Sequence, residues 1–129
     1  MEFYNKREES ILHSKSKSFA VRVINLIRTL NTRERVLSPL YDQLLRSGTS
    51  IHANIRESEF AHSSSDFINK LTISLKEANE TAGWLELFCE AKCITSTEYV
   101  GMMHDCNELI ALLVASINTK KKNSQIVVK

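Results

Sequence analysis

The fold of this chain of 129 residues is decided by one stretch near its middle, Leu44-Leu45-Arg46-Ser47-Gly48-Thr49-Ser50-Ile51-His52-Ala53-Asn54-Ile55-Arg56-Glu57. Apolar residues recur there at alternating four- and three-residue steps, as along the seam of a left-handed helix bundle. Gly48 lies on this seam inside the helix, where glycine costs up to ~1 kcal/mol relative to alanine. We therefore expect a neighbouring helix to approach closely at Gly48.

The helix that contains this stretch is expected to begin at Ser38 as N-cap, with Pro39 at the first helical position. A serine-rich break follows at about residues 61–65, where Asp66 suits the start of the next helix. The predicted core stripe of the first of these two helices comprises Leu37, Leu40, Tyr41, Leu44, Gly48, Ile51 and Ile55.

Three other segments show the same helical periodicity. They predict helices over residues 18–31, over residues 65–90, and from a Thr95–Glu98 capping box to about residues 120–122. Residues 1–17 are predicted as a polar arm and residues 123–129 as a polar tail, on either side of one bundle domain over residues 18–122. Four amphipathic helices with short connections predict an all-α, antiparallel up-down-up-down four-helix bundle.

The composition excludes several classes of protein. A single proline and three glycines argue against a β-sandwich or barrel. Three cysteines, no secretory leader and no apolar run near the ~20 residues of a membrane span predict a cytoplasmic protein with reduced thiols and no membrane partner. We find no Gly-rich phosphate loop, nucleophile elbow or credible catalytic triad. The chain is therefore predicted to be a non-enzyme, without a cofactor or a metal site.

Charge is distributed unevenly along the chain. Residues 1–56 hold ten Lys/Arg against five Asp/Glu, residues 57–119 hold three against ten, and the last ten residues add four lysines. This split indicates a side that faces nucleic acid, complementary faces that associate, or simply solvated helix faces. The candidate nucleic-acid contacts are Arg22, Arg28, Arg33, Arg35, Arg46, Arg56, Lys120, Lys121 and Lys122.

Polar residues follow a heptad-like rhythm beside the apolar stripes of the two central helices. The predicted members of this polar network are Ser50, Asn54, Glu57, Glu77 and Glu80. One interpretation is structural, with hydrogen bonds across the two helices that fix their register. The other is a small-ligand or metal pocket that uses the carboxylates of both helices.

The third predicted helix has more apolar surface than one contact requires. Its second flank carries Ile73, Trp84, Leu87 and Phe88. This surplus predicts either a surface for self-association or a wide stripe buried within the monomer.

The central run resembles a known bacterial family. The similarity lies in Ser47-Gly48-Thr49-Ser50-Ile51, Asn54-Ile55-x-Glu57 and Lys76-Glu77-Ala78-x-Glu80-Thr81-x-x-Trp84-Leu85, and extends over about residues 19–121. The family comprises small four-helix-bundle proteins encoded in intervening sequences of large-subunit ribosomal RNA genes. The resemblance implies a ring-like homo-oligomer, a pentamer, and distant similarity to the nucleic-acid-associated accessory proteins of diversity-generating retroelements. The acidic second half of this chain departs from a purely basic surface.

These observations predict a non-enzymatic, oligomeric bundle that serves as a scaffold or as an accessory factor associated with RNA or DNA. The alternative from another class is a helical bundle that binds a small ligand or a metal through the carboxylates of its two central helices.

Overall fold

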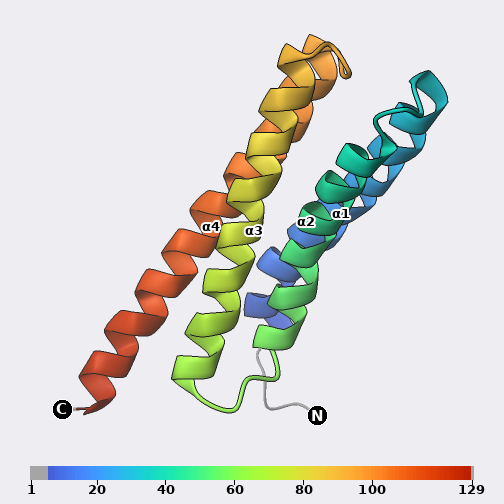
Figure 1. Cartoon of the computed structure of the whole chain (residues 1–129). Helices are drawn as coiled ribbons and strands as arrows, with labels where there is room; N and C mark the ends of the chain where they lie inside the picture. The colour runs from blue at the N-terminus through green and yellow to red at the C-terminus, as the bar shows by residue number, and fades with distance from the viewer. Residues whose placement is uncertain (1–5, 129) are drawn as a thin grey trace.

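The computed structural model describes residues 6–128, and the side chains of residues 11–124. These residues form four helices and no strand: α1 (Lys6–Arg33), α2 (Ser38–Ser58), α3 (Ser64–Glu90) and α4 (Ser96–Val128). The helices run alternately up and down, and the α1–α2 and α3–α4 connections lie at the same end (Figure 1). The prediction of an all-α, antiparallel four-helix bundle is confirmed.

Sequential helices make the main contacts. α2 packs against both α1 and α3, and α4 packs against α3, whereas α1 and α4 contact each other less extensively. The predicted seam of α2 is confirmed, because Tyr41, Leu44, Gly48, Ile51 and Ile55 are buried. Leu40 was also predicted in this stripe, but it is 40% exposed because it lies in the first turn, at the rim of the bundle.

The helix starts follow their capping chemistry with one exception. Thr95 and Glu98 form the predicted capping box. The Thr95 hydroxyl accepts the backbone N–H of Glu98 at 3.1 Å, and the Glu98 carboxylate accepts the backbone N–H of Thr95 at 2.9 Å. Ser63 caps α3 by accepting the N–H of Asp66 at 3.0 Å. The exception is α2, whose N-cap is Leu37 rather than Ser38 and has no side-chain cap; Pro39 supplies the N-terminal signal there.

α1 and α4 are longer than the sequence predicts. α1 begins at Lys6 rather than at about Ser18, so residues 6–17 of the expected arm are helical. α4 continues to Val128 instead of ending near Lys122. No glycine or proline interrupts either extension, so no helix-breaking residue stops either helix there. Residues 1–5 of the expected arm and Lys129 of the expected tail lie outside the described residues.

α4 is apolar for a surface helix. Its segment Ser96–Ser124 is long and apolar enough to cross a bilayer by length and composition, although no such run was expected from the sequence. One side of this helix is buried in the core at Met102, Cys106, Leu109, Leu113 and Ile117. A helix with one side in the core of a bundle has this same composition, so length and composition alone are weak evidence for a membrane span.

Candidate functional site

Buried hydroxyl groups join α2 to α3. The side chains of Ser47 and Thr81, both fully buried, share a hydrogen bond of 2.9 Å. One level further along, the buried Ser74 donates to the backbone carbonyl of Ile51 at 2.9 Å. These side chains are small, so the two helices can approach closely. Their hydroxyl groups all have hydrogen-bond partners, so they stabilise one register of α2 against α3.

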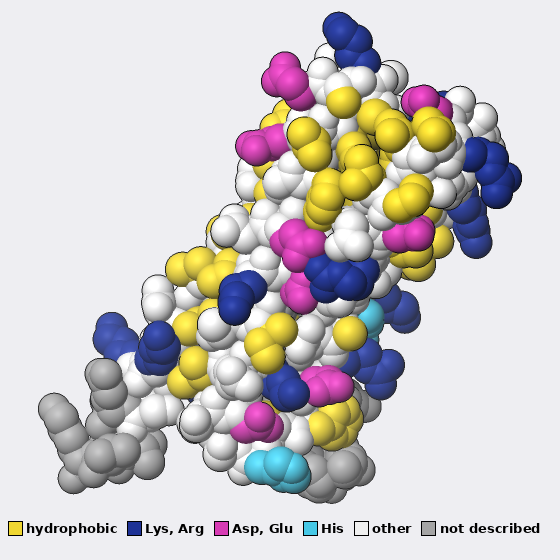
Figure 2. All heavy atoms as spheres, viewed as in Figure 1, with side chains coloured by type: hydrophobic (Ala, Val, Ile, Leu, Met, Phe, Trp, Pro, Cys, Tyr) yellow, Lys and Arg dark blue, Asp and Glu magenta, His cyan; other side chains and the backbone are white. Residues whose placement is uncertain are grey.

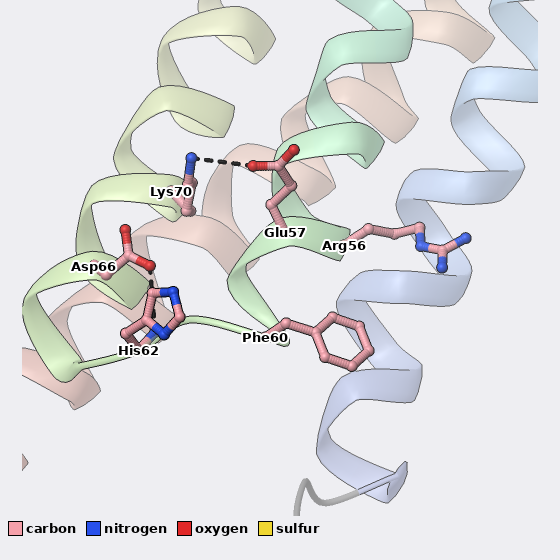
Figure 3. A pocket seen from close by; sticks show the side chains of 6 residues that line it. All are labelled: Arg56, Glu57, Phe60, His62, Asp66 and Lys70. Carbon is pink, nitrogen blue, oxygen red and sulfur yellow. Dashed lines mark hydrogen bonds and ion pairs between the residues drawn. The ribbon is translucent and has the colours of Figure 1, made fainter. Parts of the chain in front are cut away.

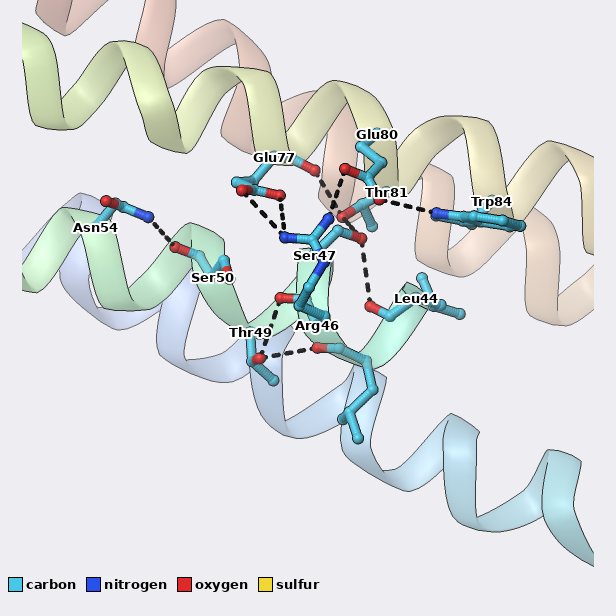
Figure 4. A network of polar contacts seen from close by, with 11 residues as sticks. Leu44, Arg46, Ser47, Thr49, Ser50, Asn54, Glu77, Glu80, Thr81 and Trp84 are labelled. Carbon is cyan, nitrogen blue, oxygen red and sulfur yellow. Dashed lines mark hydrogen bonds and ion pairs between the residues drawn. The ribbon is translucent and has the colours of Figure 1, made fainter. Parts of the chain in front are cut away.

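Arg46 covers this layer from the solvent side. Its guanidinium contacts Glu77 at 3.1 Å and Glu80 at 2.6 Å, and the indole N–H of Trp84 donates to Glu80 at 3.1 Å (Figure 4). The hydrogen bonds from Arg46, and then that from Trp84, lower the pKa of Glu80. The same contact with Glu80, followed by the charge of Glu77, raises the pKa of Arg46. Glu80 is therefore held as an ion by a cation of the same chain, and Glu77 pairs with the same guanidinium.

The other predicted members of the polar network do not join this group. The amide of Asn54 donates to the backbone carbonyl of Ser50 at 2.9 Å, within α2. Glu57 pairs with Lys70 at 3.0 Å, and this pairing raises the pKa of Lys70. Residues 46 and 57 are about 16 Å apart along the helix axis. The structure therefore does not bring Glu57, Glu77 and Glu80 together, and each has a basic partner, which removes the geometric basis of a shared ligand or metal pocket.

Two of the predicted nucleic-acid contacts, Arg33 and Arg22, are bound by acidic residues of α4. Arg33 forms a bidentate pair with Glu98 at 2.7 and 2.8 Å, and Arg22 pairs with Asp105. Lys15 pairs with Glu108 at 3.1 Å along the same seam. Thus much of the charge asymmetry of the sequence is complementarity between α1 and α4 within one chain, the two helices that contact each other least extensively.

Of the cations in these α1–α4 ion pairs, Arg33 has the strongest effect on the pKa of its partner. Its hydrogen bonds lower the pKa of Glu98 to about 2, and the backbone N–H of Thr95 contributes in the same direction. The contact with Glu98 in turn raises the pKa of Arg33. Bidentate pairing of this kind is geometrically specific, so it fixes the α1–α4 spacing at this end.

Three of the predicted arginines keep their charge for other partners. Arg28, Arg35 and Arg56 are exposed and have no ion pair among the described side chains, although Arg28 donates to Asn25 at 3.0 Å within α1. Lys120 lies over the ring of Phe67, 5.1 Å from its centroid, and Lys121 and Lys122 are exposed. Of the predicted basic set, these residues can contact phosphates without first breaking an ion pair.

A hollow lies beside the connection between α2 and α3. It has a volume of about 530 Å³ and is lined by Arg56, Glu57, Phe60, His62, Asp66 and Lys70 (Figure 3). Phe60 is 57% exposed, an unusual position for a large aromatic side chain. No aromatic platform was expected from the sequence, because Phe60 follows a helix end and belongs to no periodic pattern.

Comparison with known proteins then places the chain. The sequence pattern of the 23S rRNA-intervening sequence proteins matches residues 8–115. The chain belongs to the 23S rRNA-intervening sequence protein family. None of the curated proteins matches it. It is similar to a protein of unknown function from the S23 ribosomal protein family of Bacteroides thetaiotaomicron, known from a crystal structure, with 48% sequence identity and a TM-score of 0.79 over 83% of this chain and 98% of that one.

The four residues predicted for self-association occupy different environments in this member of the 23S rRNA-intervening sequence protein family. Phe88 is a correction: it is 1% exposed and packs edge-on against Tyr41, so it belongs to the core. Trp84 stacks on Phe88 and is half-buried, as is Ile73. Leu87 is 52% exposed. Hydrophobic side chains gather over the upper parts of α2 and α3 (Figure 2).

The structure also reveals a polar cluster between α1 and α2 that was not expected from the sequence. Ser16, fully buried, lies 2.9 Å from Nδ1 of His52, and Nδ1 of His13 lies 2.8 Å from Glu59. The two imidazole rings meet edge-on at 5.0 Å. Burial, and then the charge of His13, lowers the pKa of His52. These contacts attach the N-terminal part of α1 to the end of α2. They account for the start of α1 at Lys6, earlier than the sequence predicts.

A second group, His104, Asp105 and Glu108 on α4, places possible metal-ligand atoms within 4.8 Å of one another. Two of the three already have basic partners, Arg22 for Asp105 and Lys15 for Glu108. All three come from one helix and are at least partly exposed, so the charges of α1 compete with any cation. We assign this group to the α1–α4 seam.

Proposed function

We propose that this member of the 23S rRNA-intervening sequence protein family is a non-enzymatic, homo-oligomeric scaffold that associates with RNA or DNA. The observation that supports it best is which exposed cations have no acidic partner within the chain. Lys17 and Arg28 on α1, Arg56 on α2 and Arg35 in the connection between them are exposed and have no ion pair among the described side chains. The edge formed by α1 and α2 thus carries free cations, whereas the other arginines with described side chains, Arg22, Arg33 and Arg46, are paired.

The positions of these residues suit an extended anion. Lys17 and Arg28 are separated by 11 residues, about three helical turns, and so lie on one side of α1. Lys17 and Arg56 are both close enough to His52 to lower its pKa, after the effects of burial and of His13. Lys and Arg side chains recur along the α1–α2 edge in Figure 2. A row of cations with this spacing would follow a phosphate backbone, with little sequence selectivity.

Self-association is the second part of the proposal, and its support is apolar surface. Leu40 on α2 is 40% exposed, and on α3 Leu87 is 52% exposed and Trp84 is half-buried. Exposed apolar groups that gather on one face are typical of protein interfaces. A pentameric ring is the assembly that the family resemblance implies. The free thiols of Cys89, Cys93 and Cys106 suit the reducing cytoplasm that we propose as its location.

Binding to nucleic acid is tested by fluorescence anisotropy with labelled RNA and DNA over a salt series. The wild-type protein should bind at low salt. The logarithm of its association constant should fall linearly with the logarithm of the salt concentration. The triple variant Lys17→Gln, Arg28→Gln, Arg56→Gln should bind more weakly, and its salt slope should fall by roughly one for each phosphate that is no longer neutralised. The matched control, Lys76→Gln with Lys92→Gln on α3 and at its end, should bind like wild type.

No binding at low salt would remove the nucleic-acid part of the proposal. Equal losses of affinity per charge removed in the triple variant and the control would show that net charge, rather than the α1–α2 edge, governs binding. Light scattering at micromolar concentration tests assembly separately. A monomeric mass would remove the oligomer, whereas an oligomer that Leu87→Lys converts to smaller species would support the apolar patch.

A further inference from the structure

We propose that the hollow beside the α2–α3 connection is a nucleobase subsite, in which an unpaired base of the bound nucleic acid stacks on Phe60. This inference rests on the proposed association with nucleic acid. It names the place where the protein contacts an unpaired base of that ligand. The ligand class is a neutral aromatic heterocycle attached to a phosphate backbone. A stretch of RNA or DNA with unstacked bases supplies it.

The arrangement of side chains suits a base with its phosphate. Phe60 exposes 57% of its surface at the lip of the hollow. Arg56 and Phe60 point to the same side of the connection, whereas His62, Asp66 and Lys70 lie on the other (Figure 3). A base stacked on the Phe60 ring would therefore place its phosphate near the Arg56 guanidinium. Aromatic rings beside cations are how proteins hold single strands without sequence preference.

The charge of the lining favours the base over a second phosphate. Two cations, Arg56 and Lys70, face two carboxylates, so the formal charges cancel. Lys70 is already paired with Glu57 at 3.0 Å, and Asp66 accepts the backbone N–H of His62 at 3.3 Å. A neutral ligand with hydrogen-bonding edges fits these partly satisfied groups, whereas another anion would meet the acidic side chains.

The hollow also continues the basic edge. Arg56 belongs both to the lining and to the row of free cations on α1 and α2. A strand that follows Arg28 and Lys17 toward the end of the bundle would reach Arg56 and then Phe60. The cations would set the path of the backbone, and Phe60 would select for bases that are not paired in a helix.

The test compares labelled single-stranded RNA, single-stranded DNA of the same sequence, and a fully paired RNA duplex. Phe60→Ala should weaken binding to the single strands by roughly 5- to 150-fold, the range of one base–aromatic stack, with an unchanged salt slope. Phe60→Trp should retain single-strand binding, and the duplex should bind both variants like wild type. Arg56→Gln should instead lower the salt slope by about one.

A base analogue adds a direct signature of stacking. A strand that carries 2-aminopurine should lose fluorescence on binding the wild-type protein and Phe60→Trp, but not on binding Phe60→Ala. Circular dichroism of each variant checks the helical fold, and Val36→Ala provides a control at an exposed apolar residue of the other helix connection. Binding of single strands that is the same for wild type and Phe60→Ala would overturn the subsite. Failure of the wild-type protein to bind any of the three ligands would instead overturn the proposed function.

Discussion

Val23 of α1 fills the space that a side chain on Gly48 of α2 would need. A Cβ atom added to Gly48 would lie 2.8 Å from one methyl group of Val23 and 2.9 Å from the other. Val23 is fully buried and β-branched, so its methyl groups have little freedom to move. The close approach expected from the sequence at Gly48 is confirmed, and α1 is the helix that makes it.

Gly48→Ala should therefore destabilise the protein. The added methyl group would force Val23 or the α1 backbone to shift, which costs about 1–3 kcal/mol in well-packed cores. Urea unfolding followed by circular dichroism measures the free energy of unfolding. The matched control is Gly83→Ala on α3, where nothing lies within 4 Å of the added atom, and it should raise stability by up to ~1 kcal/mol. Equal effects of the two substitutions would contradict the role of Val23.

The hydroxyl pair between α2 and α3 gives a second prediction. Thr81→Val keeps the shape of the side chain but removes the 2.9 Å hydrogen bond to Ser47, which leaves a buried hydroxyl without this partner. We expect a loss of about 1–2 kcal/mol in the free energy of unfolding. Ser47→Ala combined with Thr81→Val should cost less than the sum of the single changes. Strict additivity in this double-mutant cycle would show that the two hydroxyl groups do not interact.

The end of α3 is formed by a lysine in an unfavourable backbone conformation. Lys92 has a φ of 63°, and the N–H of the following Cys93 donates to the carbonyl of Phe88 at 2.8 Å, as in a Schellman cap. Glycine adopts this conformation without the strain of a Cβ atom, so Lys92→Gly should raise stability by about 1 kcal/mol in a urea titration. Lys92→Ala serves as the control for loss of the side chain and should not stabilise. A gain in both variants would point to removal of the charge instead.

The Arg33–Glu98 pair predicts a dependence of stability on pH. Because the pKa of Glu98 is about 2 in the folded chain against 4.5 for an ordinary glutamate, the unfolded chain binds more protons between these values. Its stabilisation is therefore present above pH 4.5 and is lost as the pH falls towards 2. Arg33→Gln should cost about 1 kcal/mol at pH 7, since the pair is partly exposed to solvent. Urea titrations at several pH values should show the difference from wild type shrinking below pH 4.5, and a constant difference down to pH 2 would refute this.

Leu87 and Phe88 are adjacent in sequence, but Leu87 is exposed and Phe88 is buried. This difference yields a final prediction. Phe88→Ala should lower the free energy of unfolding by about 3–5 kcal/mol, because it removes a ring packed between Tyr41 and Trp84. Leu87→Ala should change it by no more than about 0.5 kcal/mol, since Leu87 is 52% exposed. Thermal unfolding of dilute protein measures both. Comparable losses would mean that Leu87 is covered in the molecule that unfolds, as it would be in an assembly.

Periodicity along the chain was sufficient to predict the bundle. Four-and-three spacing identified the α2 seam, and the capping pattern of Thr95 and Glu98 identified the start of α4. These signals are local, because helix formation and capping depend on residues within one or two turns. The same locality explains the errors at Leu40 and at the start of α1. Both depend on how a helix end packs against its neighbours.

The polar residues were harder to interpret because their partners come from other helices. The sequence grouped Glu57 with Glu77 and Glu80 and placed Arg46 among the nucleic-acid contacts. In the folded chain Arg46 binds the two glutamates of α3, and Glu57 binds Lys70 instead. Spacing along one helix shows which residues share a face, but not which charge lies across from them.

By itself the sequence determined the number of helices, their order and most of their buried faces, because apolar periodicity and capping act over a few residues. The tertiary structure alone decided which cations are paired, which side chain lies against Gly48 and where an aromatic ring stands exposed. Those properties depend on side chains that are distant in sequence, such as Arg33 and Glu98, and only packing brings them to hydrogen-bond distance. For this reason the stretch around Gly48 could predict the fold, whereas Phe60 became a candidate contact only once the fold was known.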